Sequence, residues 1–378
     1  MMIKIVADDK IPFLNGVLEP YAAIRYLPGH SIESEDIKDA DALIVRTRTR
    51  CSGELLKGSA VKFIGTATIG YDHIDTRYCK RNGIEWVNAP GCNSSSVLQY
   101  IITALLKISG DFNFQLQGKT IGIIGVGHVG SKVERFARTI GMNVLLNDPP
   151  RAGREGSDKF TGLDEVLEQS DIITLHVPLT LSGKHKTFHM IDDHQLGKIR
   201  ENAWLINSAR GEVADTSSLK KALERRLIKG AVIDVWEKEP DIDNELMNLA
   251  YMATPHIAGY SSDGKANGTA MIVNKLSGYF GLPLTEWYPH GIKEPANQVI
   301  QINATGRDFE DILREAVNHT YNISADDNRL RSSPSGFEKQ RGDYPARREF
   351  PAYTVSIEGA SDGDIAKLSE LGFKVIIR

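Results

Sequence analysis

The chain of 378 residues is too long for a single ordinary hydrophobic core, so we expect two or three domains. Its 41% hydrophobic and 25% charged residues are typical of a globular protein, and a formal net charge of −4 gives no general reason to bind nucleic acid or a membrane surface. No apolar run approaches the length that spans a bilayer, and MMIKIVADDK predicts a first strand rather than a signal peptide. Because the three cysteines (Cys51, Cys79 and Cys92) lack CxxC spacing, we expect a reducing, cytoplasmic location.

The first ninety residues alternate short apolar runs with polar stretches that leave room for helices. Strands are predicted at 3–8, 41–46, 61–68 and 83–90. This alternation is typical of an α/β domain with a mostly parallel sheet. Serines precede the next apolar run and a glycine ends it, so a helix is predicted at 94–110.

A second α/β series follows this helix. Its strands are predicted at 119–125, 143–148, 171–177, 203–209, 230–236 and 249–256. Six strands at this spacing favour a doubly wound nucleotide-binding domain. A helix is then predicted at 270–280, where the chain returns to the first domain, and the proline-rich segment 281–295 indicates a domain boundary.

The remaining residues differ in composition from the two α/β series. We predict a helix near 308–320, a polar and arginine-rich loop at 324–349, and a strand–helix–strand ending. The arginines of that loop are expected to be solvated or to lie at an interface (Arg341, Arg347 and Arg348). Because so short a segment is small for an independent core, we expect it to associate with a second copy in a two-fold homodimer.

The sequence IGIIGVGHVG places Gly125, Gly127 and Gly130 in a GxGxxG pattern, directly after a predicted strand and at the start of a predicted helix. Such glycines allow a tight turn and a close approach of the backbone to a pyrophosphate, which the helix N-terminus favours. The next strand ends in Asp148, eighteen residues after Gly130. A carboxylate there accepts hydrogen bonds from the adenosine ribose hydroxyls and repels a 2′-phosphate, so NAD is predicted rather than NADP.

Three loops that follow strands of the second series carry charged or titratable side chains. NSARG contains Arg210, DVWEKEP contains Glu239 and TPHIAG contains His256. Ligands bind at the carboxyl ends of the strands in an open parallel sheet, where these loops are expected. An arginine fork binds a carboxylate through two hydrogen bonds, and a histidine oriented by a carboxylate accepts a hydroxyl proton as hydride leaves the same carbon. The three side chains therefore predict oxidation of a 2-hydroxy acid.

In this order and spacing, the glycine loop with Asp148 and the three charged loops resemble the NAD-dependent D-2-hydroxyacid dehydrogenase family. The resemblance implies a Rossmann-type doubly wound nucleotide-binding domain inserted in a flavodoxin-like α/β substrate domain. A small α+β C-terminal domain is expected to follow. The implied boundaries are 1–93 with 257–285 for the substrate domain, 94–256 for the NAD-binding domain and 286–378 for a C-terminal dimerisation domain.

The resemblance also implies roles for individual residues. Arg210 holds the substrate, His256 is the acid/base group and Glu239 is its partner. Cofactor contacts are implied for Gly125, Gly127, His128, Val129, Gly130, Asp148, Ser208, Ala209, Asp234 and Gly259. Substrate contacts are implied for Arg46, Thr47, Thr68, Ile69, Gly70 and Tyr260. This chain has Gln99 where the family usually has glutamate, and we expect no effect of that change on the chemistry.

Two features narrow the substrate to a small phosphorylated 2-hydroxy acid. In LIVRTRTR, Arg46, Arg48 and Arg50 alternate with threonines and offer a second anion site, although exposed edge charge explains Arg48 and Arg50 equally well. The C-terminal region resembles the extra, dimerising domain of one branch of the family, not the regulatory domain of phosphoglycerate dehydrogenases. Two alternatives stay open: a phosphoglycerate dehydrogenase, and an NAD-sensing binding protein on the same scaffold.

Of the ten histidines, only His256 is expected to act in the chemistry. His185 and His189 have helical i, i+4 spacing, but neither they nor His194 has an acidic partner or an HExxH motif. We therefore predict no metal site. Three further histidines are expected to be structural or to lie beside the cofactor (His73, His128 and His176).

Overall fold

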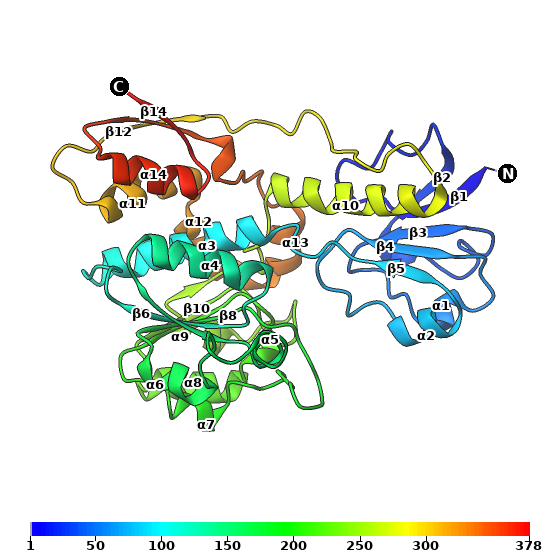
Figure 1. Cartoon of the computed structure of the whole chain (residues 1–378). Helices are drawn as coiled ribbons and strands as arrows, with labels where there is room; N and C mark the ends of the chain where they lie inside the picture. Colours follow the sequence, from blue (N-terminus) through cyan, green and yellow to red (C-terminus); the bar gives the residue numbers. More distant parts are fainter. Residues whose placement is uncertain (1) are drawn as a thin grey trace. The chain divides into compact units, whose positions relative to one another are not determined.

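The computed structural model describes residues 2–378 and divides the chain into two compact units, each built from two segments (Figure 1). Unit 1 comprises Met1–Asn93 and Ser261–Lys293, and unit 2 comprises Ser94–Tyr260 and Glu294–Arg378. The C-terminal residues therefore share a compact unit with the predicted NAD-binding residues. Among residues 2–378, no helix combines the length and apolar character that crossing a bilayer requires.

Unit 1 contains a five-stranded parallel sheet with the order β2-β1-β3-β4-β5, which is the flavodoxin-like order. Its strands are β1 (Ile3–Asp8), β2 (Ala22–Leu27), β3 (Ala42–Val45), β4 (Phe63–Thr66) and β5 (Glu85–Val87). Its helices are α1 (Gly53–Leu56), α2 (Thr76–Arg81) and α10 (Ser262–Phe280), with a 3-10 turn η1 (Gly29–Ser31). The sequence pattern does not reveal β2, because this edge strand includes Arg25 and lacks a continuous apolar run.

Helix α10 packs on β4 in unit 1. Gly65 leaves the space for this contact, since a Cβ there would lie 2.5 Å from the side chain of Ile272. The helix begins at Ser262, well before the predicted start at 270, because the Ser261 side chain accepts a hydrogen bond from the N–H of Gly264 and caps it.

The larger sheet of unit 2 contains the six predicted strands, all parallel, in the order β11-β10-β9-β8-β6-β7. They are β6 (Thr120–Ile124), β7 (Asn143–Asn147), β8 (Ile172–Leu175), β9 (Trp204–Asn207), β10 (Gly230–Ile233) and β11 (Met252–Ala253). The helices between them are α3 (Ser94–Asp111), α4 (His128–Thr139), α5 (Pro149–Glu155), α6 (Leu163–Gln169), α7 (Asp193–Leu196), α8 (Thr216–Glu224) and α9 (Asn244–Leu249), with the 3-10 turn η2 (Gly211–Val213). The chain order reverses beside β6, and open α/β sheets bind ligands at such a switch point.

The C-terminal part of unit 2 adds a three-stranded parallel sheet in the order β12-β13-β14. Its strands are β12 (Val299–Asn303), β13 (Thr354–Glu358) and β14 (Lys374–Ile377). Its helices are α11 (Phe309–Thr320), α12 (Ile323–Ser332), α13 (Phe337–Gly342) and α14 (Asp362–Glu370), with the 3-10 turns η3 (Pro334–Gly336) and η4 (Phe350–Ala352). The predicted helix near 308–320 and the strand–helix–strand ending are confirmed, whereas β12 was not expected.

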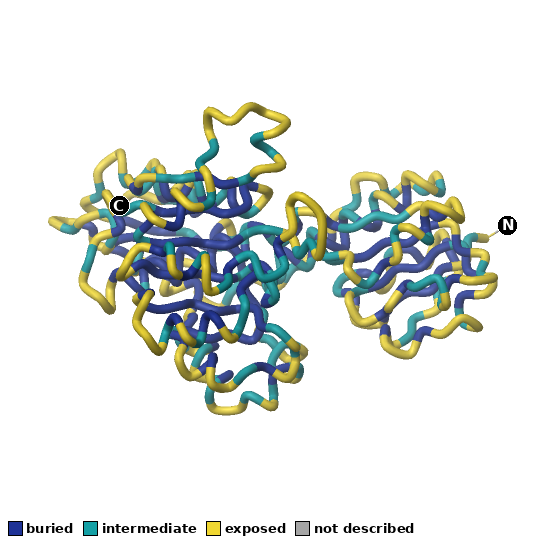
Figure 2. Tube along the Cα trace, turned by 90° about the horizontal axis from the view of Figure 1, so that it is seen from below, coloured by how far each residue is buried: buried dark blue, intermediate teal, exposed yellow. Residues whose placement is uncertain are grey.

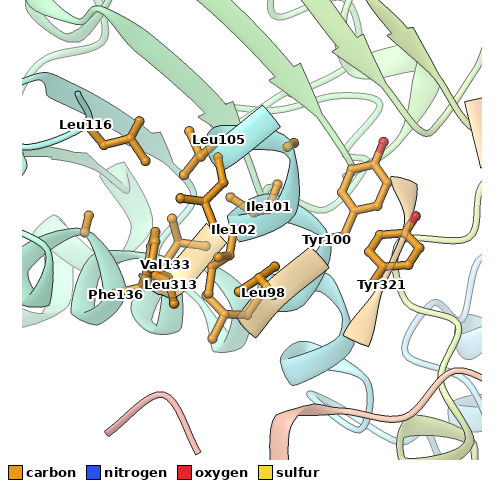
Figure 3. Close-up of a cluster of buried hydrophobic side chains, with 14 of the residues drawn as sticks. Leu98, Tyr100, Ile101, Ile102, Leu105, Leu116, Val133, Phe136, Leu313 and Tyr321 are labelled. Atoms are coloured by element: carbon orange, nitrogen blue, oxygen red, sulfur yellow. The ribbon is translucent and has the colours of Figure 1, made fainter. Parts of the chain in front are cut away.

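Helix α3 lies at the centre of the core of unit 2. Its buried Ile101 and Ile102 belong to one apolar cluster with Val133 and Phe136 of α4 and with Leu313 of α11 (Figure 3). In Figure 2 the buried stretches of chain, in dark blue, lie inside each unit, and exposed loops, in yellow, surround them. The C-terminal helices therefore share a core with the nucleotide-binding sheet.

The prediction of a polar, arginine-rich loop at 324–349 is wrong. Helices α12 and α13 occupy much of this segment, and Arg347 and Arg348 are only 5% and 8% exposed. The guanidinium of Arg347 lies over the ring of Tyr321, 4.4 Å from its centroid. Charge density alone predicts solvation or an interface, but Arg347 lies against an aromatic ring and carbonyl groups of its own unit, and Arg348 pairs with Glu294 at 3.1 Å.

Candidate active site

The predicted dinucleotide loop joins β6 to α4 in unit 2. Gly125 has a φ of +90°, and a Cβ there would lie 2.7 Å from the backbone of His176. A Cβ at Gly130 would lie 2.1 Å from the carbonyl oxygen of Gly125, so this position also requires glycine. A Cβ at Gly127, the N-cap of α4, would meet no other group within 4 Å. The loop thus leaves open space at the first turn of a twelve-residue helix, which fits a pyrophosphate.

Asp148 follows the end of β7, next to this loop. Its Oδ2 accepts a hydrogen bond from the N–H of Val126 at 2.9 Å, and its Oδ1 caps α5 by accepting one from the N–H of Arg151 at 3.0 Å. The Arg151 guanidinium donates to the Val126 carbonyl oxygen at 2.5 Å and pairs with Glu155 at 2.7 Å. The carboxylate is therefore fixed beside the glycine loop, where a ribose is expected.

Other predicted cofactor residues lie in the first turn of α4, after the glycine loop, and in the loop after β9. The buried hydroxyl of Ser208 makes no hydrogen bond to any part of the chain that the structure describes. An orphaned buried hydroxyl indicates a missing partner, which a bound dinucleotide would supply. The N–H of buried Ala209 donates to Asn207 Oδ1 at 3.1 Å. His128 and Val129 form the first turn of α4, and His128 is exposed.

Arg210 lies in the loop that follows the buried strand β9. Asn207 folds this loop by donating from Nδ2 to the carbonyl oxygen of Arg210 at 3.0 Å. A Cβ at Gly211 would lie 2.0 Å from the carbonyl carbon of Trp236, so the glycine lets the Arg210 loop lie directly against the loop after β10. The Arg210 side chain is partly exposed, and its Nη1 donates to the carbonyl oxygen of Ala209 at 2.8 Å.

Glu239 and His256 are joined by a hydrogen bond of 2.7 Å between Oε2 and Nδ1. The other carboxylate oxygen of Glu239 accepts from the N–H of Trp236 at 2.9 Å. Burial by itself would raise the pKa of Glu239, but the hydrogen bond and charge of His256 and the Trp236 N–H together lower it below its usual value. The His256 side chain is 30% exposed, so the pair is oriented by the protein and remains accessible.

Asp234 is buried beneath the loop that carries His256. Its Oδ1 accepts from Thr254 Oγ1 at 2.6 Å and from the N–H of Ile257 at 2.8 Å, and its Oδ2 accepts from the N–H of Ala258 at 2.9 Å. Burial raises the pKa of Asp234 despite these donors. The hydroxyl of Tyr100 lies 2.8 Å from Thr254 Oγ1 and extends the network to α3. Asp234, which is predicted to contact the cofactor, thus also fixes the backbone of residues 257 and 258, directly before Gly259.

The remaining predicted substrate residues lie in unit 1, apart from Tyr260 in unit 2. Arg46 and Thr47 follow β3, and Thr68, Ile69 and Gly70 follow the neighbouring strand β4. The Thr68 hydroxyl donates to the carbonyl oxygen of Gly70 at 2.9 Å, and the N–H of Ala89 donates to the carbonyl oxygen of Thr68 at 3.0 Å. Arg46 Nη1 donates to the carbonyl oxygen of Lys10 at 3.2 Å. The structure therefore brings these five residues to one edge of the sheet.

Two of the other histidines have surroundings that bear on the predictions. His176 is partly buried beside Thr174, and desolvation lowers its pKa to about 3. The expectation that His189 lacks an acidic partner is wrong: its Nε2 lies 2.6 Å from Glu237 and its Nδ1 lies 3.4 Å from Asp215. The three side chains are close enough to hold a metal ion, but both ring nitrogens already face a carboxylate. Asp215 and Glu237 are distant from His189 in sequence, so spacing gives no signal of this cluster.

The sequence gives no signal for a further charge beside the site. Arg341 of α13 lies over the ring of Tyr260, 5.8 Å from its centroid, and its charge helps to lower the pKa of Glu239. It stands far along the chain in a polar segment without a motif, so only the packing of the C-terminal part reveals it.

The fold and this site define an NAD-dependent dehydrogenase that acts on 2-hydroxy acids. Residues 107–258 match the family described as D-isomer specific 2-hydroxyacid dehydrogenase, NAD binding domain, and residues 292–372 match a domain of unknown function (DUF3410). D-lactate dehydrogenase from Aquifex aeolicus, solved with NAD and lactic acid, is similar with a TM-score of 0.62 and 27% identity over 76% of this chain and 99% of that chain.

Two sequence relatives extend this likeness to the C-terminal part. Erythronate-4-phosphate dehydrogenase of Bacteroides thetaiotaomicron is 50% identical over 354 residues, which are 93% of this chain and 99% of that protein. The protein of the same name from Proteus mirabilis is 37% identical over 374 residues, which are 98% of this chain and 99% of that protein. The chain belongs to the erythronate-4-phosphate dehydrogenase family, a branch of the D-isomer specific 2-hydroxyacid dehydrogenases.

Proposed function

We propose that this protein oxidises 4-phospho-D-erythronate at C2 with NAD, forming 2-oxo-3-hydroxy-4-phosphobutanoate and NADH as a step of pyridoxal 5′-phosphate (vitamin B6) biosynthesis. The observation that carries the proposal is the 2.7 Å hydrogen bond between His256 and Glu239, at the sheet edge that also presents Arg210. Relatives that are named for this substrate, at 37% to 50% identity, support the choice of hydroxy acid.

His256 is the proposed base for the C2 hydroxyl. Because its Nδ1 bonds Glu239, Nε2 is the ring nitrogen that accepts the hydroxyl proton. The lowered pKa of Glu239 keeps this carboxylate ionised at neutral pH, where its charge stabilises the imidazolium that forms.

The remaining groups of unit 2 are proposed to bind and orient the substrate and NAD. Arg210 is proposed to hold the substrate carboxylate with its guanidinium fork, which directs C2 and its hydrogen. The glycine loop with His128 and Val129 would hold the pyrophosphate of NAD, Asp148 the ribose, and Ser208, Ala209, Asp234 and Gly259 the nicotinamide half. When bound, NAD accepts the hydride from C2.

Unit 1 is proposed to supply further substrate contacts. The backbone N–H groups of Ile69 and Gly70, beside Thr68, would hold the substrate carboxylate, and Arg46 with Thr47 would hold the phosphate. Tyr260 of unit 2 remains a separate proposed substrate contact. We keep 1–93 with 257–285 as the proposed substrate-binding part, 94–256 as the NAD-binding part and 286–378 as the dimerising part.

The test is NADH formation with 4-phospho-D-erythronate and with 3-phospho-D-glycerate, which is shorter by one hydroxymethylene. We expect the higher kcat/KM with 4-phospho-D-erythronate. A higher value with 3-phospho-D-glycerate would make the protein a phosphoglycerate dehydrogenase. NAD binding without turnover of either acid would favour the alternative of an NAD-sensing binding protein.

We further propose that the protein is a homodimer and that it works in the cytoplasm. Two exposed apolar side chains on the edge strand β14 support an interface there, since Ile376 and Ile377 are 56% and 66% exposed. Ile377→Lys should weaken the dimer in light scattering, whereas Leu181→Lys, on a 68% exposed side chain between β8 and α7, should not. Equal dimer stability in both variants would contradict this interface, and membrane-bound protein after cell fractionation would contradict the location.

A further inference from the structure

The loop that carries His256 is bonded on both sides of its backbone within unit 2. On the amide side, Asp234 accepts from the N–H groups of Ile257 and Ala258 at 2.8 and 2.9 Å. On the carbonyl side, Arg347 Nη2 donates to the carbonyl oxygens of the same two residues, at 3.2 and 2.6 Å. The peptide group between Ile257 and Ala258 is therefore bonded on both sides, its carbonyl oxygen by Arg347 and its N–H by Asp234.

The backbone of His256 requires such support. Its φ of +55° lies in the left-handed region, which is unfavourable for a residue with a Cβ. A backbone of this kind persists only where the surrounding contacts over-determine it. The N–H of His256 donates to the carbonyl oxygen of Asp234 at 2.7 Å, and the bonds to Ile257 and Ala258 hold the next turn of chain. Loss of one side of this support leaves a strained residue free to relax.

The stability of the fold alone does not explain why residue 347 is an arginine. Its side chain is 5% exposed, and within residues 2–378 its Nε and Nη1 make no hydrogen bond. A buried charge with unpaired N–H groups is unfavourable unless electrostatic partners offset it. Tyr344, Tyr321 and the carboxylates of Asp326 and Asp234 are those partners, and Asp234 is the residue that bonds the other side of the loop.

The segment around Arg347 is itself anchored to α3. Gln99 Nε2 donates to the carbonyl oxygen of Arg348 at 3.1 Å, and the Ser96 hydroxyl donates to Glu349 Oε1 at 2.7 Å. An ionised glutamate at position 99 could not donate to that carbonyl group. The amide at position 99 therefore helps to hold the C-terminal arginine against the catalytic loop.

We propose that Arg347 is a positioning residue for catalysis: by bonding the carbonyl groups of Ile257 and Ala258, it fixes the backbone from which His256 meets Glu239. Arg347 acts through the loop, and the catalytic part of this inference rests on the proposed function. The C-terminal part thus contributes to the chemistry in addition to any role in association.

Arg347→Met, which keeps the volume and removes the donors, tests the contact directly. Hydrogen exchange at the amides of Ile257 and Ala258 should accelerate about 10- to 100-fold, the range that corresponds to one lost charge-assisted hydrogen bond. Arg347→Lys keeps the charge and should restore part of the protection. Arg329→Met is the matched control, because Arg329 pairs with Asp326 at 3.0 Å and the catalytic loop is not among its partners. Unchanged exchange at 257 and 258 in folded Arg347→Met would overturn the proposal.

Kinetics of the same variants separate positioning from a general loss of structure. In Arg347→Met we expect kcat to fall about 10- to 100-fold, with the substrate KM and the Kd of NAD changed by less than about three-fold and with partial recovery in Arg347→Lys. A parallel loss of NAD affinity, or no loss of kcat, would contradict the positioning role. If the parent protein itself forms no NADH, the proposed function fails, and the exchange data still decide whether Arg347 holds the loop.

Native-state exchange of the parent protein gives a measurement that needs no variant. At low denaturant concentration, the amides of Ile257 and Ala258 should open together with residues 344–350. Opening of residues 344–350 while 257 and 258 stay protected would overturn the proposal even if Arg347→Met does not fold.

Discussion

Replacing Glu239 by glutamine removes the charge beside His256 while it preserves the shape of the side chain. The hydrogen bond is 2.7 Å long, and the Glu239 side chain is only 18% exposed, so solvent screens the pair weakly. A hydrogen bond to a charged group contributes about 1.5–3 kcal/mol, and two unit charges about 4 Å apart at an effective dielectric constant of 20 interact by about 4 kcal/mol. Because about 1.4 kcal/mol changes a rate tenfold, kcat should fall about 10- to 1000-fold.

The lowered pKa of Glu239 determines the pH range in which this substitution has an effect. The pKa of Glu239 is lowered, so its charge supports His256 at every pH above that lowered value and is lost only as the pH falls through it. Glu239→Gln should therefore lower kcat/KM at every pH above the lowered pKa of Glu239, and the difference from the parent should shrink as the pH falls through that pKa.

The assay is NADH formation with 4-phospho-D-erythronate across this pH range. Glu237→Gln is a matched control, because Glu237 lies in the same loop and pairs with a different histidine, through Nε2 of His189 at 2.6 Å. Turnover of Glu239→Gln within about two-fold of the parent, or an equal loss in Glu237→Gln, would refute the assignment of Glu239.

Three further substitutions test the other predicted roles. His256→Asn should keep NAD binding, measured by fluorescence titration, and lower kcat about 10²- to 10⁴-fold; near-normal turnover would remove His256 from its role. Arg210→Lys should lower kcat/KM severely in the same NADH assay, because an ammonium cannot reproduce the planar two-bond contact with a carboxylate; an unchanged value would place the carboxylate elsewhere. Asp148→Ser should raise the ratio of kcat/KM for NADP to that for NAD, since it removes a ribose acceptor and a negative charge; a constant ratio would mean that another residue governs the choice of cofactor.

Local pattern predicted the elements that position the site and missed those that depend on distant contacts. Buried parallel strands such as β6 and β9 are continuous apolar runs, so the sequence locates them and the loops that follow them. The edge strand β2 includes Arg25, and β12 includes Gln301 and Asn303, so neither strand is a continuous apolar run. Helix α12 was missed because its apolar face is narrow amid charged residues.

The same distinction holds within the site. Arg210, Glu239 and His256 each follow a strand in a short motif, so their common edge follows from the topology of a parallel sheet. Arg347 reaches its carbonyl partners only through the packing of the C-terminal part on α3, and no spacing in the sequence encodes that contact.

The positions of the cysteines allow the opening of unit 1 to be measured separately from that of unit 2. All three cysteines of the chain (Cys51, Cys79 and Cys92) lie in unit 1, each is at most 9% exposed, and none of them forms a disulfide. Burial also raises the pKa of the Cys51 thiol to about 12, so little reactive thiolate is present while the unit stays closed. A pulse of alkylating reagent therefore labels the protein only when unit 1 opens, and it leaves unit 2 unmarked. The natural sequence thus carries a reporter that separates the unfolding of the two units without any engineered probe.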